Sequence, residues 1–178
     1  MKKLTIVASL IAVFGTVGMA QAASTGTITF EGKLTASTCD VTIDGQETDA
    51  LVVLPTVSTN ALAAATRTAG DTRFMMELTN CSTTENVSAF FQAGASVDSN
   101  GRLINNGTAT EVSLQLLDGS SPGLDVINIG SQDQVLQTAY QPTSSGSASL
   151  PYIVRYYAEG ATGPGNVVSN VVYNIQYQ

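Results

Sequence analysis

The 178-residue sequence contains no histidine and no tryptophan, and only two of its residues are cysteines. Without histidine the chain cannot form a Ser-His-Asp triad or a histidine-activated thiol. Two cysteines alone are also too few ligands for a zinc site. Carboxylates distant in the sequence can still meet as a catalytic pair in a fold, although no pattern points to one. The sequence therefore supports no enzyme, metal site or cofactor.

Basic side chains are scarce as well. The whole chain has seven Lys and Arg residues against fourteen Asp and Glu residues. Two of the lysines lie in a leader that we expect to be removed, which leaves five basic groups and a net charge of −9. Nucleic acid and anionic lipid would both repel such a protein, so neither is an expected partner.

The leader is MKKLTIVASLIAVFGTVGMAQA, residues 1–22. It carries Lys2 and Lys3, an apolar run from Leu4 to about Val17, and a small-x-small motif that ends at Ala22. A membrane anchor is the alternative, but the run is shorter than the roughly 20 apolar residues that span a bilayer. We expect residues 1–22 to be a cleaved secretory signal and the mature protein to begin at residue 23.

The two cysteines, Cys39 and Cys81, both lie in the exported part of the chain. In an oxidising compartment they are expected to form one disulfide. The 42-residue separation gives a loop-entropy contribution of about 4 kcal/mol.

Most of the mature chain has the pattern of short strands separated by turns rich in Gly, Asn, Asp and Ser. A short helical turn within 58–68, capped by Ser58, Thr59 or Asn60, is the exception. Many short strands at close spacing predict an all-β sandwich in a single domain. The predicted strands are 27–35, 40–44, 50–55, 72–80, 87–93, 110–118, 125–129, 134–140, 150–159 and 167–177.

One loop has a faint likeness to a calcium site. VDSNGR (97–102) contains Asp98 and Asn100 but lacks the remaining oxygen ligands and the closing glutamate. A tight turn through Asn100 and Gly101 is the better interpretation.

The mature N-terminus alternates strictly between apolar and polar residues. Ile28, Phe30, Gly32 and Leu34 fall on one face of a strand, and the residues between them are polar. One interpretation is the first strand of the protein's own sandwich. Gly32 argues for another, because a glycine in mid-strand often marks a place where a neighbour approaches closely.

The C-terminus alternates in the same way, with Val171, Tyr173, Ile175 and Tyr177 on one face. No later strand of the sequence is available to cover this one, and an exposed apolar edge is an aggregation hazard. We therefore expect a segment of another molecule to pair with it.

These residues resemble the subunits of fimbriae assembled by the chaperone-usher pathway. Gly165, fourteenth from the end, and the penultimate Tyr177 are similar to the family's C-terminal motif. Phe30, Gly32 and Leu34, just before Cys39, resemble its donor extension. Segments 110–124 and 150–165 are similar to those of type 1 major subunits, and the resemblance covers essentially the whole mature chain.

The resemblance implies an incomplete immunoglobulin-like sandwich that lacks its last strand and is completed by donor-strand complementation. A periplasmic chaperone would first lend a strand, and at the outer-membrane usher the extension of the next subunit would replace it. Ile28, Phe30, Gly32 and Leu34 would be donated. Gly165, Val171, Tyr173, Ile175 and Tyr177 would form the acceptor groove and the chaperone-binding strand.

The expected organisation is a signal peptide (1–22), a donor extension (23–38) and a pilin domain (39–178). The expected function is a structural, non-enzymatic subunit of a surface fimbria, a homopolymer of identical or related subunits. Size favours a shaft subunit over a two-domain tip adhesin, and a minor adaptor stays open. The alternatives are a pilin-like adhesive subunit, which binds a host glycan or protein receptor through loops such as 96–107, and a free secreted sandwich.

Overall fold

A computed structural model of the protein describes residues 26–32, 34, 38–82 and 84–178. The chain divides into two units, Met1–Leu34 and Thr35–Gln178. In the first unit the described residues are exposed and form no helix or strand. The predicted signal peptide, residues 1–22, lies outside the described residues. None of the helices in the described part of the chain is long and apolar enough to cross a lipid bilayer.

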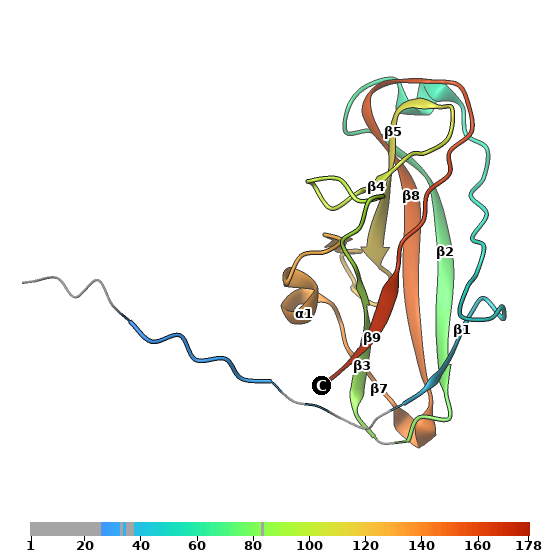
Figure 1. Ribbon diagram of the computed structural model, residues 1–178. Helices are drawn as coiled ribbons and strands as arrows, with labels where there is room; N and C mark the ends of the chain where they lie inside the picture. Colours follow the sequence, from blue (N-terminus) through green and yellow to red (C-terminus); the bar gives the residue numbers. More distant parts are fainter. Residues whose placement is uncertain (1–25, 33, 35–37, 83) are drawn as a thin grey trace, which may run out of the picture. The chain divides into compact units, whose positions relative to one another are not determined.

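The second unit contains a larger antiparallel sheet, shown in Figure 1, with strand order β1-β2-β8-β5-β4 and β6 paired to β5. Its long central strands β2 and β8 pair from Thr68–Tyr157 to Leu78–Ala148, with a bulge between Ala69 and Thr72. The strands are β1 (Asp40–Ile43), β2 (Thr68–Thr79), β4 (Leu103–Ile104), β5 (Thr110–Asp118), β6 (Val126–Ile127) and β8 (Ala148–Gly163).

A smaller antiparallel sheet has the order β7-β3-β9. Its strands are β7 (Gln141–Pro142), β3 (Asn86–Phe91) and β9 (Tyr173–Tyr177). β3 pairs along its length with β9, from Val87–Tyr177 to Phe91–Tyr173, and at its beginning with β7. β9 therefore joins the C-terminal end of the chain to a strand near its middle.

The core lies where the two sheets contact each other, because alternate residues of each strand turn inward. Tyr152 of β8 is 2% exposed, and its ring lies 5.1 Å from the ring of Phe91 in β3 and 5.7 Å from that of Phe74 in β2. Its hydroxyl also accepts a hydrogen bond of 2.9 Å from the Ala89 N–H. One tyrosine thus ties the sheets together, and the predicted sandwich is confirmed.

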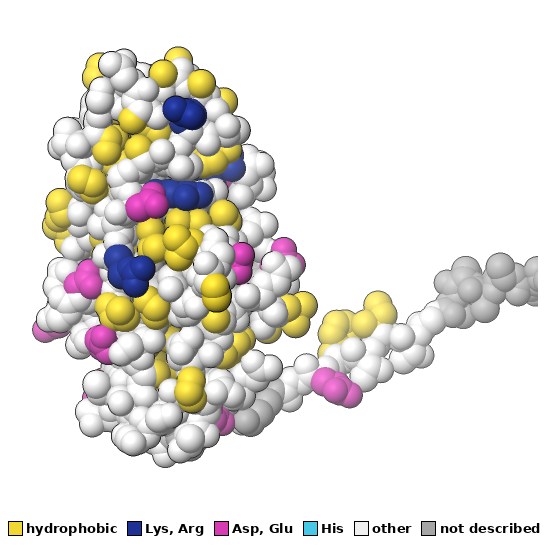
Figure 2. Space-filling view, turned by 180° about the vertical axis from the view of Figure 1, so that it is seen from behind, with side chains coloured by type: hydrophobic (Ala, Val, Ile, Leu, Met, Phe, Trp, Pro, Cys, Tyr) yellow, Lys and Arg dark blue, Asp and Glu magenta, His cyan; other side chains and the backbone are white. Residues whose placement is uncertain are grey.

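Charges on the outer face of the larger sheet are mixed. Arg102 forms a hydrogen-bonded ion pair of 2.8 Å with Glu159 and lies 4.3 Å above the ring of Tyr157. Figure 2, the view from behind, shows basic and acidic side chains spread among hydrophobic ones on the visible face. Lys and Arg side chains therefore form no continuous patch on this visible face.

Two short helical turns and one short helix complete the unit. The 3-10 helix η1 (Thr59–Leu62) begins after Ser58, whose hydroxyl accepts a hydrogen bond from the Asn60 N–H, so the predicted capped turn is confirmed. A second 3-10 turn, η2, covers Ser144–Gly146. The predicted strand 134–140 is wrong, because α1 (Asp133–Gln137) occupies most of it. The segment is short enough for an apolar alternation to fit either a strand or a helix.

The predicted strand 50–55 is also wrong as a strand, since residues 50–58 form no ladder. Its side chains nevertheless alternate between partly buried and exposed positions. Val52 and Leu54 pack against the core, whereas Leu51 and Val53 are each 74% exposed. The segment therefore has a buried face without the hydrogen-bonded neighbour that defines a strand.

Candidate functional site

An apolar groove of about 720 Å³ opens between the C-terminal strand and the segment that follows β1. Figure 1 shows β9 in front of the central strands, with the chain after β1 running along the other side of β2. Phe74, Met76, Phe91, Leu116 and Val154 lie at its floor. The groove thus exposes part of the core that the two sheets share.

The first wall of the groove consists of β9 and the residues just before it. Val171, Tyr173 and Ile175 line the groove and pack against the core, whereas Val172 borders the groove but is 59% exposed. Tyr177 packs against the same core at the end of the strand. The alternation seen in the sequence therefore places one face of this strand against the groove.

The second wall consists of β1 and the segment 48–54. Val41, Ala50, Val52 and Leu54 line it with partly buried side chains. The side-chain amide of Gln46 holds the loop, because it accepts a hydrogen bond from the Leu51 N–H and donates one to the Leu51 carbonyl, both of 3.1 Å. Sequence reasoning missed this wall, although the alternation in 50–55 was its signal.

The main chain of β9 has an open edge. Asn86 and Gln178 exchange two main-chain hydrogen bonds, of 3.0 and 2.8 Å. Hydrogen-bonded and non-hydrogen-bonded pairs alternate along an antiparallel ladder, so the main-chain N–H and C=O groups of Tyr173, Ile175 and Tyr177 point away from β3. Within the described part of the chain β9 pairs with no strand other than β3. These three residues can therefore form hydrogen bonds with an added strand.

The hydroxyl groups of two tyrosines in β9 form hydrogen bonds with the main chain of residues after and before β1. The Tyr173 hydroxyl donates a hydrogen bond of 3.1 Å to the Thr48 carbonyl oxygen. Burial raises the pKa of Tyr173, and the charge of nearby Asp49 raises it further, so the phenol remains a donor at neutral pH. Burial also raises the pKa of Tyr177, while a hydrogen bond with the Cys39 main chain acts in the opposite direction. The Tyr173 hydroxyl therefore links β9 to the loop of the second wall.

The predicted donor residues lie in the other unit. Ile28, Phe30 and Leu34 are 78%, 89% and 102% exposed, and a Cβ added at Gly32 would meet no atom within 4 Å. Three large apolar side chains on one short segment are therefore fully available for burial elsewhere. Their role as donors stays a prediction.

Gly165 does not line the groove. It lies near the start of the C-terminal segment, in a different hollow that Thr56, Val57 and Leu62 also line. Its φ of 156° is unusual for other residues, and a Cβ there would overlap the main chain at Thr108 and Ala109. Glycine is thus required here for a close approach of two chain segments.

The two cysteines form the predicted disulfide. Cys39 immediately precedes β1, and Cys81 follows β2 two residues after its last residue. The bond therefore reinforces the pair of strands that borders one end of the groove.

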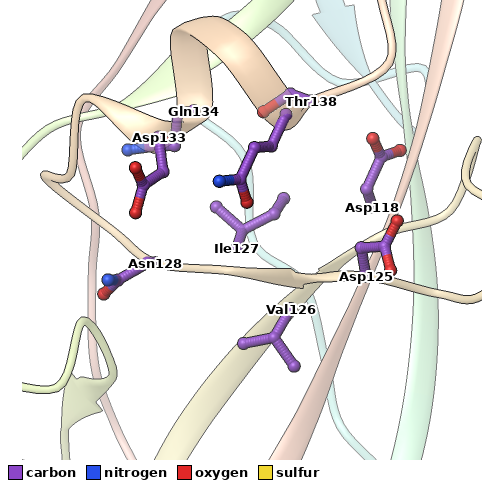
Figure 3. A pocket seen from close by; sticks show the side chains of 9 residues that line it. Asp118, Asp125, Val126, Ile127, Asn128, Asp133, Gln134 and Thr138 are labelled. Atoms are coloured by element: carbon purple, nitrogen blue, oxygen red, sulfur yellow. The ribbon is translucent and has the colours of Figure 1, made fainter.

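A polar hollow lies between β6 and α1 (Figure 3). Asp118, Asp125 and Asp133 surround it, but the Asp118 carboxylate already accepts hydrogen bonds of 2.8 Å from the Ser120 and Ala139 N–H groups. Among the described residues, no group of three or more His, Cys, Asp or Glu side chains is placed to hold a metal ion. The Asp118 carboxylate therefore holds the surrounding loops in place.

The loop 97–102 is a turn, as predicted. The Asp98 carboxylate accepts hydrogen bonds of 2.8 Å from the Asn100 and Arg102 N–H groups, and Gly101 has a positive φ of 70°. Its carboxylate is thus used to close the turn.

Comparison with known sequences gives a consistent result. A family model described as "Type-1 fimbrial protein, A" matches residues 54–178. The chain is 43% identical over 166 residues to the "Major fimbrial subunit SMF-1" of Stenotrophomonas maltophilia strain K279a, which covers 89% of this chain and 96% of that protein.

Solved structures show the same fold. The chain is similar to a subunit in the structure of a chaperone-usher pilus, with a TM-score of 0.58 and 18% identity over 88% of this chain and 98% of that one. It is also similar to the P pilus rod subunit PapA, with a TM-score of 0.58 and 14% identity over 79% of this chain and 99% of that one. These likenesses confirm the incomplete immunoglobulin-like sandwich.

Proposed function

Because this chain belongs to the type-1 fimbrial protein family and is a structural subunit of a surface fimbria, we propose that it polymerises by donor-strand exchange. As a member of this structural family it is not an enzyme. The groove beside β9 would receive the segment around residues 28–34 of a second copy. A chain of such contacts would build the fimbria.

The observation that carries this proposal is the open edge of β9 beside an apolar groove. Strand addition needs free main-chain groups at a sheet edge and pockets for alternate side chains. Tyr173, Ile175 and Tyr177 direct their main-chain groups to that edge, and the groove floor is formed by core residues. Both requirements are met at one place in the fold.

The leading segment has matching chemistry. Burial of Ile28, Phe30 and Leu34 at roughly 1.5–3 kcal/mol each contributes about 5–9 kcal/mol before the cost of ordering the segment. Main-chain hydrogen bonds to β9 add to this. A donor of this kind would cover the apolar floor that the subunit leaves open.

The delivery route follows from the same open edge. An uncovered apolar edge would aggregate during export, so a partner must cover it before assembly. We assign this role to a periplasmic chaperone that lends a strand to the groove, and the exchange for the next subunit's segment to an outer-membrane usher. Residues 1–22 would direct export.

The contact is head-to-tail, since one copy gives its leading segment and another gives its groove. Such a heterologous contact does not close on itself and extends into a filament. This geometry supports a repeated shaft subunit, as does the chain's likeness to a major fimbrial subunit.

A matched pair of substitutions in the leading segment tests the proposal. Phe30→Asp removes about 1.5–3 kcal/mol of burial at each junction and adds a charge, so filament yield should fall at least tenfold. Thr29→Asp adds the same charge on the polar face and should leave the yield unchanged. Electron microscopy of cells that express each variant measures the outcome. Normal filaments from Phe30→Asp would exclude donor-strand exchange through this segment.

A further inference from the structure

The smaller sheet has a second edge, along the side of β3 that faces away from β9. The same alternation that opens β9 directs the main-chain groups of Val87, Ala89 and Phe91 toward this edge. β7 covers only the beginning of it, where Val87 pairs with Gln141. A strand could in principle add to the remainder, at residues 89–91.

The main-chain groups of Ala89 and Phe91 at this edge already form hydrogen bonds within the molecule. The Phe91 N–H donates a hydrogen bond of 2.9 Å to Gln134 Oε1, and Gln134 Nε2 donates one of 3.0 Å to the Phe91 carbonyl. The Ala89 N–H donates to the Tyr152 hydroxyl, at 2.9 Å. The Gly130 N–H adds a further bond of 3.0 Å to the Phe91 carbonyl. The edge is thus bonded to side chains and a loop.

The Gln134 side chain forms the two main-chain hydrogen bonds with Phe91 that a neighbouring strand would otherwise form. A carboxamide offers one acceptor and a donor in the same plane, as a peptide unit does, and both reach the two main-chain groups of a single residue. The side chain is 3% exposed although it belongs to the short helix α1, whose other side chains are largely exposed. The buried amide attaches this helix to β3 through two hydrogen bonds.

The two edges of one sheet therefore differ in kind. β9 presents open main-chain groups beside an apolar groove, whereas β3 presents groups that are already hydrogen-bonded. An incoming strand would have to break both Gln134 bonds before it could pair with Phe91, and it would share the Phe91 carbonyl with the Gly130 N–H. Unmade buried hydrogen bonds are costly. The difference favours addition at β9.

We propose that Gln134 is a specificity-determining residue that closes the β3 edge and so directs strand addition to β9. The choice of β9 as the productive edge rests on the proposed function. The closure of the β3 edge does not depend on that function, because it concerns where a strand does not add. Through Gln134, helix α1 contributes to assembly by covering the edge of β3.

The test locates the attachment site of a donor peptide on the full mature protein. A synthetic peptide of residues 26–36 carries a photoreactive benzoyl group on the ring of Phe30, and mass spectrometry maps the cross-links. Wild type should be labelled around β9 and remain unlabelled at residues 89–91. Gln134→Met keeps the side-chain length and loses both hydrogen bonds, so it should gain at least tenfold more label at residues 89–91.

Gln137→Met is the matched control, because Gln137 lies in the same helix and is exposed. It should give the wild-type map. Label at residues 89–91 in wild type, or the wild-type map from folded Gln134→Met, would overturn the closure. If no protein were labelled around β9, the proposed function would be contradicted. Label at residues 89–91 in Gln134→Met would still support the closure of β3 in that case.

A second variant keeps the test decisive if Gln134→Met does not fold. In Gln134→Glu, a protonated carboxyl group can accept from the Phe91 N–H and donate to the Phe91 carbonyl, as the amide does. A carboxylate cannot donate. Label at residues 89–91 should therefore be absent at acid pH and appear as the pH rises. A map that does not change with pH would contradict the closure.

Discussion

Gly32 shows how one residue can matter to an assembly without affecting its own fold. In this chain its surroundings are open, and it has no positive φ that would strain another residue. A Cβ added at this position therefore meets no atom within 4 Å. Any effect of a substitution must arise where the segment contacts a partner.

We expect Gly32→Leu to block fibre formation while the variant folds with unchanged stability. The physical reason is overpacking, which typically costs 1–3 kcal/mol where a close-packed site receives extra methylene groups. Thermal unfolding measures stability, and electron microscopy measures fibres. Gly26→Leu is the control, since its site is equally open in the free chain and precedes Ile28, the first large apolar residue of the segment. Normal fibres from Gly32→Leu would remove the argument for a narrow site.

At the scale of elements, the disulfide connects the two strands that border the groove on one side. β1 has only four residues, and among the strands of the described residues it pairs with β2 alone, over Asp40–Thr79 to Ile43–Met76. So short an edge strand has few hydrogen bonds of its own. The Cys39–Cys81 bond closes the end of this pair and restrains one wall of the groove.

We predict that the double variant Cys39→Ala, Cys81→Ala loses up to about 4 kcal/mol of unfolding free energy, the loop-entropy value for this separation. Urea unfolding of oxidised and reduced wild type, beside the variant, measures the loss. Reducing agent should lower the stability of wild type and leave the variant unchanged. Equal midpoints for the oxidised wild type and the variant would show that β1 is held by packing alone.

At the scale of the whole molecule, tyrosines govern the response to alkaline pH. Burial raises the pKa of five tyrosines above the ordinary value. In the unfolded chain these phenols ionise near pH 10, so the unfolded state loses protons first as the pH rises. Their contribution to stability is therefore complete below about pH 10 and is lost as the pH rises through the folded values. The five residues are Tyr140, Tyr152, Tyr156, Tyr173 and Tyr177.

We expect the unfolding free energy to be similar at about pH 7 and pH 9 and to fall at about pH 11. No histidine is present to add a transition near neutral pH. Urea unfolding at the three pH values, with tyrosinate absorbance followed in parallel, checks this. In Tyr152→Phe the alkaline decline should be shallower. A steady loss from neutral pH upward would contradict the assignment to tyrosines.

The amino-acid sequence alone was enough for several features that depend on local periodicity. The alternation of Val171, Tyr173 and Ile175 identified a strand with one buried face, and the structure places that face along the groove. The count and position of Cys39 and Cys81 identified the disulfide. Such features follow from side-chain chemistry at fixed spacing, which a single strand carries by itself.

Helix α1 and the segment 50–55 required the tertiary structure. Gln134 is buried because the main chain of Phe91, 43 residues away, offers it two hydrogen bonds. Val52 and Leu54 face the groove although their segment belongs to no ladder. Periodicity shows which face of a segment is apolar, but whether its main chain has a neighbour depends on distant residues.

The order of apolar and polar residues along the chain was enough to show which segments have an apolar face. Which sheet edges stay open depends on the three-dimensional fold, because an edge is closed by whichever groups the fold brings beside it. On one side of the smaller sheet a side-chain amide fills that place, and on the other side an apolar groove remains. That difference arises from contacts between residues far apart in the chain, which no local pattern records.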